Sequence, residues 1–279
     1  MNIQTTPQRK FKGRVIAVTN QKGGVGKTTT TINLATAMAA CGKKVLVMDF
    51  DPQGNASTGV GLGYDQRARG TYEVLFGVAP LEDVAHTTRV PGLMIAPASV
   101  HLAGAEIELV NAERREFRLR EAIANTNLDV DYILIDCPPS LNLLTLNALV
   151  ASDAVLVPLQ CEFYALEGLS HLVKTIERVK RILNPNLDLH GIILTMYDRR
   201  NTLSASVESD VREYFGDRVY QTVIPRNVRV SEAPSHGLPV LVYDMKCPGS
   251  QAYIALASEV IKREKQIEQT TKAKELEAA

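Results

Sequence analysis

Short apolar segments alternate along the chain with longer segments in which apolar residues recur every three to four positions. The short segments predict strands, and 155–157 and 192–194 are continuously apolar, which is typical of strands covered on both faces. The predicted strands are Val15–Thr19, Lys44–Phe50, Leu93–Pro97, Tyr132–Asp136, Ala154–Leu159, Gly191–Met196, Val219–Ile224 and Val240–Tyr243.

The longer segments predict helices between most of these strands. In 166–183, for example, Leu169, Leu172, Ile176 and Val179 follow helical spacing. The predicted helices are Thr28–Cys41, Ala103–Asn125, Leu166–Leu183, Ser204–Tyr214 and Gln251–Ile267. Strands alternating with helices predict right-handed crossovers. We therefore expect an α/β fold of three layers, a mostly parallel twisted sheet with helices on both faces.

No internal repeat and no Pro/Gly linker divides the sequence, so we expect one main domain over residues 14–263. Residues 1–13 are polar and basic and predict a flexible arm, too short for a helix-turn-helix domain. Residues 264–279 are rich in Lys and Glu, with few large apolar residues. They predict a C-terminal tail that extends the last helix and then frays.

Composition narrows the function classes. The 279 residues hold 31 Lys plus Arg and 31 Asp plus Glu, a net charge of zero, which excludes nucleic-acid binding by bulk charge. With 45% hydrophobic and 22% charged residues, the chain is not disordered overall. No signal peptide or membrane span is recognisable, so we expect a cytoplasmic protein without a membrane partner. Cys41, Cys137, Cys161 and Cys247 are too widely spaced for a zinc site or a disulfide framework.

The strongest motif lies between the first predicted strand and the first predicted helix, in the segment Asn20–Thr29 (NQKGGVGKTT). Glycines allow backbone N–H groups to curl around an anion, and the helix N-terminus adds unpaired donors. Lys27 would contact the β- and γ-phosphates, and the Thr28 hydroxyl is a suitable Mg²⁺ ligand. This context predicts a P-loop NTPase fold that binds a nucleoside triphosphate with Mg²⁺. Gln21 replaces the usual first glycine, and a second lysine, Lys22, follows it.

Acidic residues end two predicted strands at the edge where α/β sheets bind ligands. Asp49 and Asp51 share one face, and a carboxylate there could orient a water molecule for attack on the γ-phosphate, while Asp51 could also serve as a metal ligand. Capping of the next turn is an alternative for both residues, above all for Asp49. Asp136 follows an apolar strand and would hold Mg²⁺ through water.

Several motifs together resemble the ParA/MinD group of ATPases with a deviant Walker A sequence, and the Soj-type partition ATPases in particular. They are Lys22–Thr29, Asp49–Asn55 (DFDPQGN), Asp136–Ser140 (DCPPS), Glu162–Gly168 (EFYALEG) and Ile224–Arg229 (IPRNVR). The resemblance covers residues 14 to about 262.

The resemblance implies roles for individual residues. Lys22 would reach the nucleotide of a second subunit and Asp51 would orient the attacking water, so that the catalytic set is Lys22, Lys27 and Asp51. The ATP-binding set would be Lys22, Gly23, Gly24, Val25, Gly26, Lys27, Thr28 and Thr29, with Met196, Pro225, Arg226 and Asn227 around adenine. A purely structural loop is the alternative for 225–227. DNA contacts fall on Arg200 and Arg229, with Arg199 and Lys246 as further candidates, unless these are ordinary solvated side chains.

As a whole, the resemblance implies an ATP hydrolase with slow turnover. ATP would drive formation of a homodimer, and the dimer would bind double-stranded DNA without sequence preference. A ParB-type centromere-binding protein would stimulate hydrolysis and reset the cycle. The protein would be cytoplasmic and nucleoid-associated, and its cargo could be a chromosome or a plasmid.

Three alternative functions can each be weighed by one feature that the sequence would need to have. A MinD-like membrane cycle needs an amphipathic C-terminal helix, for which 262–279 is too polar. An iron–sulfur ATPase of the nitrogenase-reductase type needs cysteines near a two-fold axis, where Cys137 is the best candidate. A binding module without hydrolysis would not need Lys27, Thr28, Asp51 and Asp136 together.

Overall fold

A single twisted sheet organises the molecule in the computed structural model, which describes residues 10–278 and side chains up to residue 273. Its seven strands lie in the order β3–β4–β2–β5–β1–β6–β7. Every neighbouring pair is parallel except β3 and β4. The strands are β1 (Arg14–Val18), β2 (Val45–Asp49), β3 (His86–Thr87), β4 (Leu93–Ala96), β5 (Tyr132–Asp136), β6 (Ala154–Gln160) and β7 (Asp188–Thr195).

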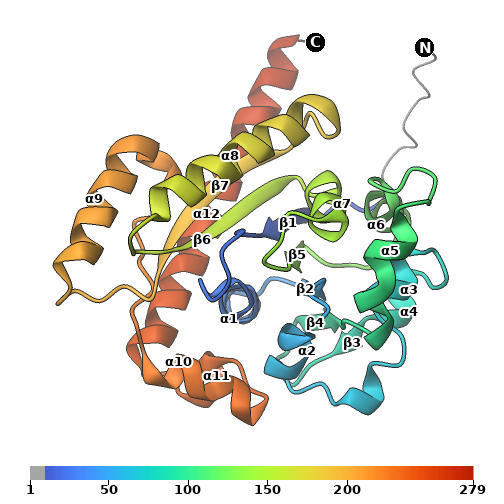
Figure 1. Cartoon of the computed structure of the whole chain (residues 1–279), viewed down its shortest axis with the longest axis horizontal. Coiled ribbons are helices and arrows are strands. Elements are labelled where there is room, and N and C mark those ends of the chain that lie inside the picture. The colour runs from blue at the N-terminus through green and yellow to red at the C-terminus, as the bar shows by residue number, and fades with distance from the viewer. Residues whose placement is uncertain (1–9, 279) are drawn as a thin grey trace.

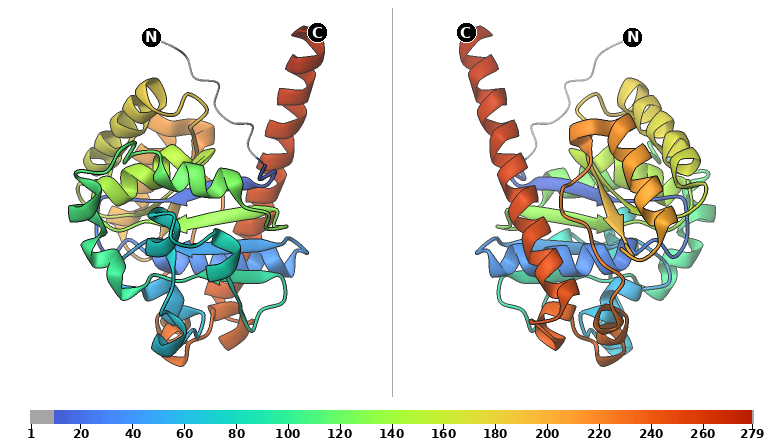
Figure 2. Two further views of the ribbon diagram at one scale, coloured as in Figure 1. Left: turned by 90° about the vertical axis from the view of Figure 1, so that its right-hand side faces the viewer. Right: turned by 90° about the vertical axis from the view of Figure 1, so that its left-hand side faces the viewer.

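Helices cover both faces of the sheet (Figures 1 and 2). One face carries α1 (Lys27–Ala40), α2 (Asn55–Gly59), α10 (Val228–Glu232), α11 (Val240–Tyr243) and α12 (Pro248–Ala278). The other carries α3 (Thr71–Leu75), α4 (Leu81–Val84), α5 (Ala105–Leu109), α6 (Arg118–Asn125), α7 (Leu143–Ala151), α8 (Ala165–Ile182) and α9 (Thr202–Phe215). Short 3₁₀ turns occupy Tyr64–Gln66, Val100–Gly104, Gly216–Arg218 and Ala233–His236.

Two hydrophobic cores, one on each side of the sheet, account for the apolar strands. Along β1, Val15 and Ala17 pack into one core, while Ile16 and Val18 pack into the other. This alternation requires both side-chain directions of a central strand to be apolar. The predicted three-layer α/β fold is therefore confirmed.

The long helix α12 packs against α1 and projects beyond the body at its C-terminal end (Figure 2). A buried polar cluster ties it to the sheet: Glu264 Oε1 lies 2.7 Å from His190 Nε2 of β7, and Arg14 Nε of β1 donates to the same oxygen at 3.2 Å. Burial acts to raise the pKa of Glu264, but His190 and Arg14 hold it below its ordinary value. No helix within residues 10–278 combines the length and apolarity needed to cross a membrane.

Three predicted elements differ from the structure. Val240–Tyr243 is the helix α11, because Pro239 starts a helical turn and a run of four apolar residues does not distinguish strand from helix. Residues 219–224 run beside β7 and donate to it from Tyr220 N and Ile224 N, but their bridge from Val219 to Ile192 is isolated, so they form no strand. The predicted helix over 103–125 is broken between α5 and α6, where Arg114 adopts a left-handed φ of 49°.

Residues 10–13 of the predicted N-terminal arm lie against the domain. Lys10 N donates to Ala124 O at 2.9 Å, and Phe11 is only 4% exposed. Residues 1–9 of the arm lie outside the described residues. At the other end, α12 runs without interruption across residue 264 to Ala278.

Candidate functional site: a phosphate-binding loop at the carboxyl edge of the sheet

The loop between β1 and α1 has the backbone geometry of an anion site. Gly24 and Gly26 adopt left-handed φ values of 75° and 87°, which are accessible to glycine at little cost. Gly26 immediately precedes α1, and its lack of a side chain leaves the helix without a side-chain cap at that position. The first N–H groups of α1 are therefore available to an anion at the positive end of the helix.

Lys27 is held inside the loop. Its side chain is largely buried, and its Nζ donates to the carbonyl of Lys22 at 2.9 Å. Burial lowers the pKa of Lys27, against the opposing effect of Asp136, Cys137 and Asp51. A cation that has already lost most of its hydration is suited to bind a phosphate group.

Asp136 occupies the end of β5 beneath this loop, fully buried. Thr31 Oγ1 donates to its Oδ1 at 3.2 Å, while its Oδ2 has no hydrogen-bond partner among the described residues. Burial and the nearby charge of Asp49 raise the pKa of Asp136 well above its ordinary value, and hydrogen bonds from Thr28 and Thr31 act in the opposite direction.

These oxygens fit a magnesium ion. Mg²⁺ binds through one or two protein oxygens together with water and substrate phosphates. Such a set is supplied by the unpartnered carboxylate oxygen of Asp136 and by the hydroxyl of Thr28, which is close enough to act on the pKa of Asp136. A bound cation would also relieve the repulsion among the buried carboxylates.

The end of β2 and the loop after it carry the other two acids. Asp51 is 8% exposed, and its Oδ1 accepts from Gln53 N at 3.0 Å, which fixes the carboxylate at the start of the turn. Asp49 is fully buried and pairs in register with Asp136. Its Oδ2 accepts from Ser57 N at 2.8 Å and Ser57 Oγ at 2.6 Å, so it binds α2 rather than the turn that directly follows.

Lys22 occupies the outside of the loop, in contrast to Lys27. Its side chain is 51% exposed and forms an ion pair with Glu162, which lies between β6 and α8. The next residue, Gly23, has open space where a side chain would begin, with no heavy atom of the described residues within 4 Å of the position that a Cβ would take. Val25 faces inward instead, and its carbonyl accepts from Thr195 Oγ1 of β7 at 2.8 Å.

A cavity of about 200 Å³ beside the loop brings together the residues predicted to surround adenine. Met196, Pro225, Arg226 and Asn227 all line it, as do Gly26 and Thr29. Asn227 also serves the fold, because its side chain caps α10 by accepting from Val230 N at 3.4 Å. The sequence analysis missed Thr195, Ile224, Val230, Ser231, Pro234 and Tyr253, which line the same cavity. Tyr253 comes from α12, more than 200 residues from the loop, and no motif marks it.

Of the basic residues predicted to contact DNA, Arg199, Arg200 and Lys246 lie on loops, and Arg229 lies on α10. A bridge between Tyr197 and Pro225 holds the segments of Arg199–Arg200 and Arg229 side by side. Arg200 makes a two-point contact with Asp198, at 3.0 and 2.9 Å. Arg229 pairs with Glu232 at 3.0 Å and Asp244 at 3.5 Å, and Lys246 lies two residues after Asp244.

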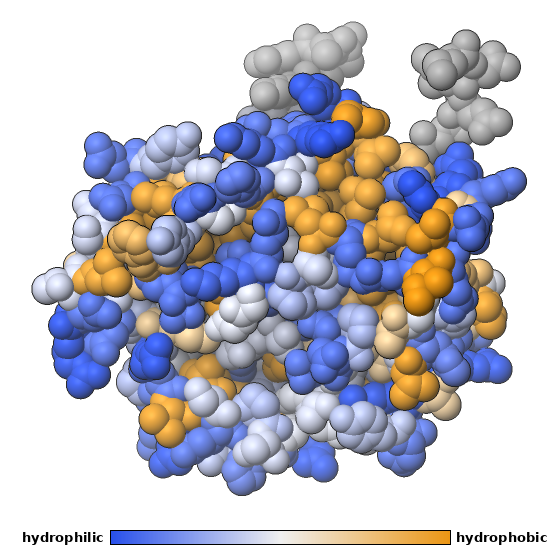
Figure 3. Space-filling model, in the orientation of Figure 1, coloured by the Kyte–Doolittle hydropathy of each residue, from blue (hydrophilic) through white to orange (hydrophobic). Residues whose placement is uncertain are grey.

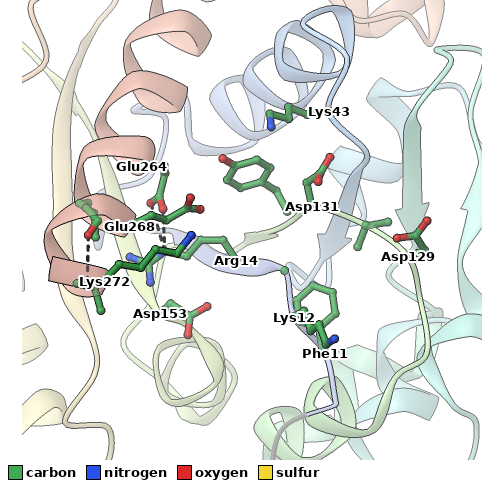
Figure 4. A pocket seen from close by; sticks show the side chains of 15 residues that line it. Phe11, Lys12, Arg14, Lys43, Asp129, Asp131, Asp153, Glu264, Glu268 and Lys272 are labelled. Carbon is green, nitrogen blue, oxygen red and sulfur yellow. Dashed lines mark hydrogen bonds and ion pairs between the residues drawn. The ribbon is translucent and has the colours of Figure 1, made fainter. Parts of the chain in front are cut away.

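A larger cavity, of about 630 Å³, lies away from this site (Figure 4). It opens at the amino ends of β1 and β5, between Arg14, Asp131 and the C-terminal part of α12. Its lining mixes acids and bases, including Lys12, Lys43 and Glu268, and contains no residue of the loop 20–29. Glycine-rich backbone, buried lysine and buried carboxylates meet at the carboxyl edge instead, and together with the sheet order they define a P-loop nucleotide-binding protein.

Comparisons with known proteins agree. Residues 13–189 match the model of a family described as AAA domain (AAA_31). The chain is 62% identical over 254 residues to the chromosome partitioning protein ParA of Caulobacter vibrioides (strain NA1000 / CB15N), covering 90% of this chain and 95% of that protein. It is 52% identical over 248 residues to the sporulation initiation inhibitor protein Soj of Bacillus subtilis (strain 168), covering 89% and 98%.

Solved structures show the same fold. Cobyrinic acid a,c-diamide synthase from Mycobacterium smegmatis, with bound ADP and magnesium, superposes with a TM-score of 0.79 at 38% identity, over 91% of this chain and 96% of that one. The septum site-determining protein MinD from Pyrococcus horikoshii OT3, complexed with Mg-ADP, gives 0.72 at 28% identity, over 89% and 96%. This chain belongs to the ParA/Soj family of chromosome-partitioning ATPases.

Proposed function

We propose that the protein is a partitioning ATPase in which Mg²⁺-ATP joins two subunits face to face, and that this dimer binds double-stranded DNA without sequence preference. Slow hydrolysis, stimulated by a ParB-type partner, would return the protein to single subunits. In the cell this cycle would take place in the cytoplasm on the nucleoid and move a chromosome or a plasmid. The observation that carries the proposal is that two lysines of one loop lie in different environments: Lys27 is buried, and Lys22 is half-exposed.

The first lysine, Lys27, is buried and already directed into the phosphate loop. The second, Lys22, is half-exposed and pairs with Glu162 at the rim. A phosphate site that is complete in one subunit gains little from a second cation on its outer side. That cation is well placed, however, to serve a triphosphate in an opposing copy, where desolvation would strengthen the contact.

The surface around the loop supports an opposing copy. Figure 1 looks onto the carboxyl ends of the strands, and in the same orientation Figure 3 shows apolar patches on the side of α5. The exposed apolar side chains of this region include Ile107 and Val110 on α5 and directly after it, and Leu141 and Phe163 follow β5 and β6. Exposed apolar side chains of this size are favourable to bury between two subunits.

Chemistry in such a dimer would rest on side chains already in place. Magnesium, when bound, would neutralise charge on the phosphate oxygens. Thr28 and Asp136 would hold the ion, Lys27 would bind the β- and γ-phosphates, and Asp51 would orient the attacking water. The carboxylate of Asp51 is already restrained by Gln53 N, so little reorganisation is needed before attack.

A gel-shift experiment with a linear DNA fragment tests the proposal. The protein with Mg²⁺ and ATP should retard DNA of any sequence, whereas ADP or no nucleotide should leave the DNA free. Asp51→Ala should retard DNA with ATP for longer than the unaltered protein, because hydrolysis no longer resets it. Equal retardation with ATP, ADP and no nucleotide would contradict the coupling of ATP to DNA binding.

A further inference from the structure

A buried arginine that no motif marks contacts the segment that directly follows Asp51. Arg67 is only 5% exposed. Among the side chains that the structure describes, residues 10–273, no Asp or Glu forms an ion pair with it. Its partners are neutral oxygens: Nε donates to Leu62 O at 3.2 Å, Nη1 to Gly54 O at 3.2 Å, and Nη2 to Thr58 Oγ1 at 3.0 Å.

These partners lie at both ends of one short helix. Gly54 immediately precedes α2 with a left-handed φ of 64°, and Leu62 follows its C-terminal end. The guanidinium therefore connects the entrance and the exit of α2 through one rigid group. It also stacks over the ring of Tyr64, with 4.5 Å between the guanidinium carbon and the ring centroid.

The helix that Arg67 fixes is the one that restrains Asp49, at the end of β2, and Asp51, in the loop that follows. Gly54 N donates to Asp51 O at 2.9 Å, so the residue that Arg67 contacts is bonded directly to the backbone of Asp51. Ser57, in the middle of α2, supplies both hydrogen bonds to Asp49 Oδ2. The position of Asp51 relative to the phosphate loop thus depends on where α2 lies.

An arginine suits this task better than other side chains. Its planar fork offers five N–H donors in a fixed arrangement, which can satisfy several acceptors at once. Burying a charge without a carboxylate partner is costly, and a neutral side chain would fill the same volume more cheaply. The presence of the charged fork in such a place indicates that the geometry it imposes is needed.

We propose that Arg67 is a positioning residue for ATP hydrolysis: it fixes α2, and thereby holds Asp51 where it can orient the attacking water. Arg67 does not line the cavity beside the phosphate loop in which Met196, Pro225 and Asn227 meet, and it is not part of the loop 20–29. The inference rests on the proposed role of Asp51. It assigns Arg67 an effect on the chemical step and none on nucleotide affinity.

The experiment compares Arg67→Met, Arg67→Lys and a control, Arg69→Met, in the full chain with Mg²⁺. Arg69 is exposed and lies two residues away. Binding of a fluorescent ATP analogue gives affinity and stoichiometry, so that only folded sites are counted. Single-turnover hydrolysis of ATP gives the rate of the chemical step. Thr58→Val removes one acceptor of the fork at an exposed position and serves as a milder variant should Arg67→Met not fold.

We expect Arg67→Met to bind the analogue within about threefold of the unaltered protein and to hydrolyse ATP roughly 10 to 100 times more slowly, since small displacements of a reacting group have costs of this size. The hydrolysis rates of Arg67→Lys and Thr58→Val should lie between those of Arg67→Met and the unaltered protein. The rate of Arg69→Met should equal that of the unaltered protein. Unaltered hydrolysis in Arg67→Met, or in Thr58→Val if Arg67→Met does not fold, would overturn the inference, as would a parallel loss of affinity. If Asp51→Ala also hydrolyses normally, the proposed role of Asp51 fails instead.

Discussion

At the scale of single residues, some side chains of the site could be predicted from the sequence and others could not. Lys27, Thr28 and Asp136 follow from motif spacing and the strand–loop–helix context, and the structure brings them together. Arg67 and Tyr253 could not be found this way. Arg67 contacts α2 and Tyr253 lines the cavity beside the phosphate loop only through tertiary structure, and neither belongs to a recurring pattern along the chain.

The buried pair Asp49 and Asp136 makes a prediction about pH. Burial raises the pKa of Asp49 to about 6, although hydrogen bonds from Ser57 act in the opposite direction. In the unfolded chain an aspartate titrates near 3.9. Between about pH 4 and pH 6 the folded state therefore binds more protons than the unfolded state, and the free energy of unfolding falls as pH rises through this window.

Urea unfolding in the presence of EDTA at a series of pH values between 4 and 7 measures this effect. The free energy of unfolding should decrease between about pH 4 and 6, and the decrease should be smaller in Asp49→Asn, which no longer titrates there. An identical pH profile in Asp49→Asn and the unaltered protein would show that Asp49 does not ionise in this range.

Asp51 makes a separate prediction about catalysis. Its carboxylate is the candidate for orienting water, and groups with such roles contribute roughly 10² to 10⁴ in rate. Asp51→Ala should therefore reduce single-turnover hydrolysis by about 10²-fold or more, while binding of a fluorescent ATP analogue persists. Asp65→Ala, at an exposed acid farther along the chain, should leave both quantities unchanged. Equal hydrolysis in both variants would remove Asp51 from the mechanism.

At the scale of elements, the central strands were predictable and the short peripheral elements were not. β1, β5 and β6 are apolar on both faces, a pattern that few helices share. Residues 240–243 show the limit of this reasoning, since the same apolar run forms a helical turn when Pro239 precedes it. The helix α7 was missed because most of its residues are apolar and buried, so that it lacks helical periodicity.

A close approach of two loops makes an element-scale prediction. Gly61, just after α2, has a φ of 85°, and a Cβ there would lie 2.7 Å from the carbonyl oxygen of Gly237. Gly77 has a similar φ of 70° but open space around it. Gly77→Ala should therefore cost only the conformational strain, about 1 kcal/mol, whereas Gly61→Ala should cost clearly more because two backbone segments must separate.

Urea denaturation of the two variants measures these costs directly. The matched φ values mean that the difference between the variants reports the clash with Gly237 and not the left-handed conformation itself. Equal destabilisation by Gly61→Ala and Gly77→Ala would contradict the close docking of the segment after α2 against residues 233–237.

At the scale of the whole molecule, the basic residues near β7 make a prediction about DNA. Arg200 and Arg229 are each bonded to carboxylates of their own subunit, so one subunit offers a weak patch and a dimer would double it. Arg200→Glu combined with Arg229→Glu should abolish gel retardation with ATP. In single variants of either arginine, the slope of log affinity against log salt concentration should become less steep by about 1 to 2, since each phosphate contact contributes about 0.9.

Arg89→Glu serves as the control for this experiment. Arg89 is also exposed, but it lies between β3 and β4, at the opposite end of the sheet from β7. Arg89→Glu should leave the affinity for DNA and the salt dependence of that affinity unchanged. Undiminished binding by the double variant would show that DNA contacts another surface.

The most direct test of the account is the mass of the protein in solution with Mg²⁺ and a non-hydrolysable ATP analogue, measured by sedimentation velocity. We predict a dimer with the analogue and a single subunit with ADP. Gly23→Val should bind the analogue and remain a single subunit, because its Cβ would meet no described residue of its own chain but the side chain would collide with an opposing copy. A protein that stays a single subunit with the analogue at every concentration, or a Gly23→Val variant that dimerises normally, would contradict the proposal that the two subunits meet at their phosphate loops.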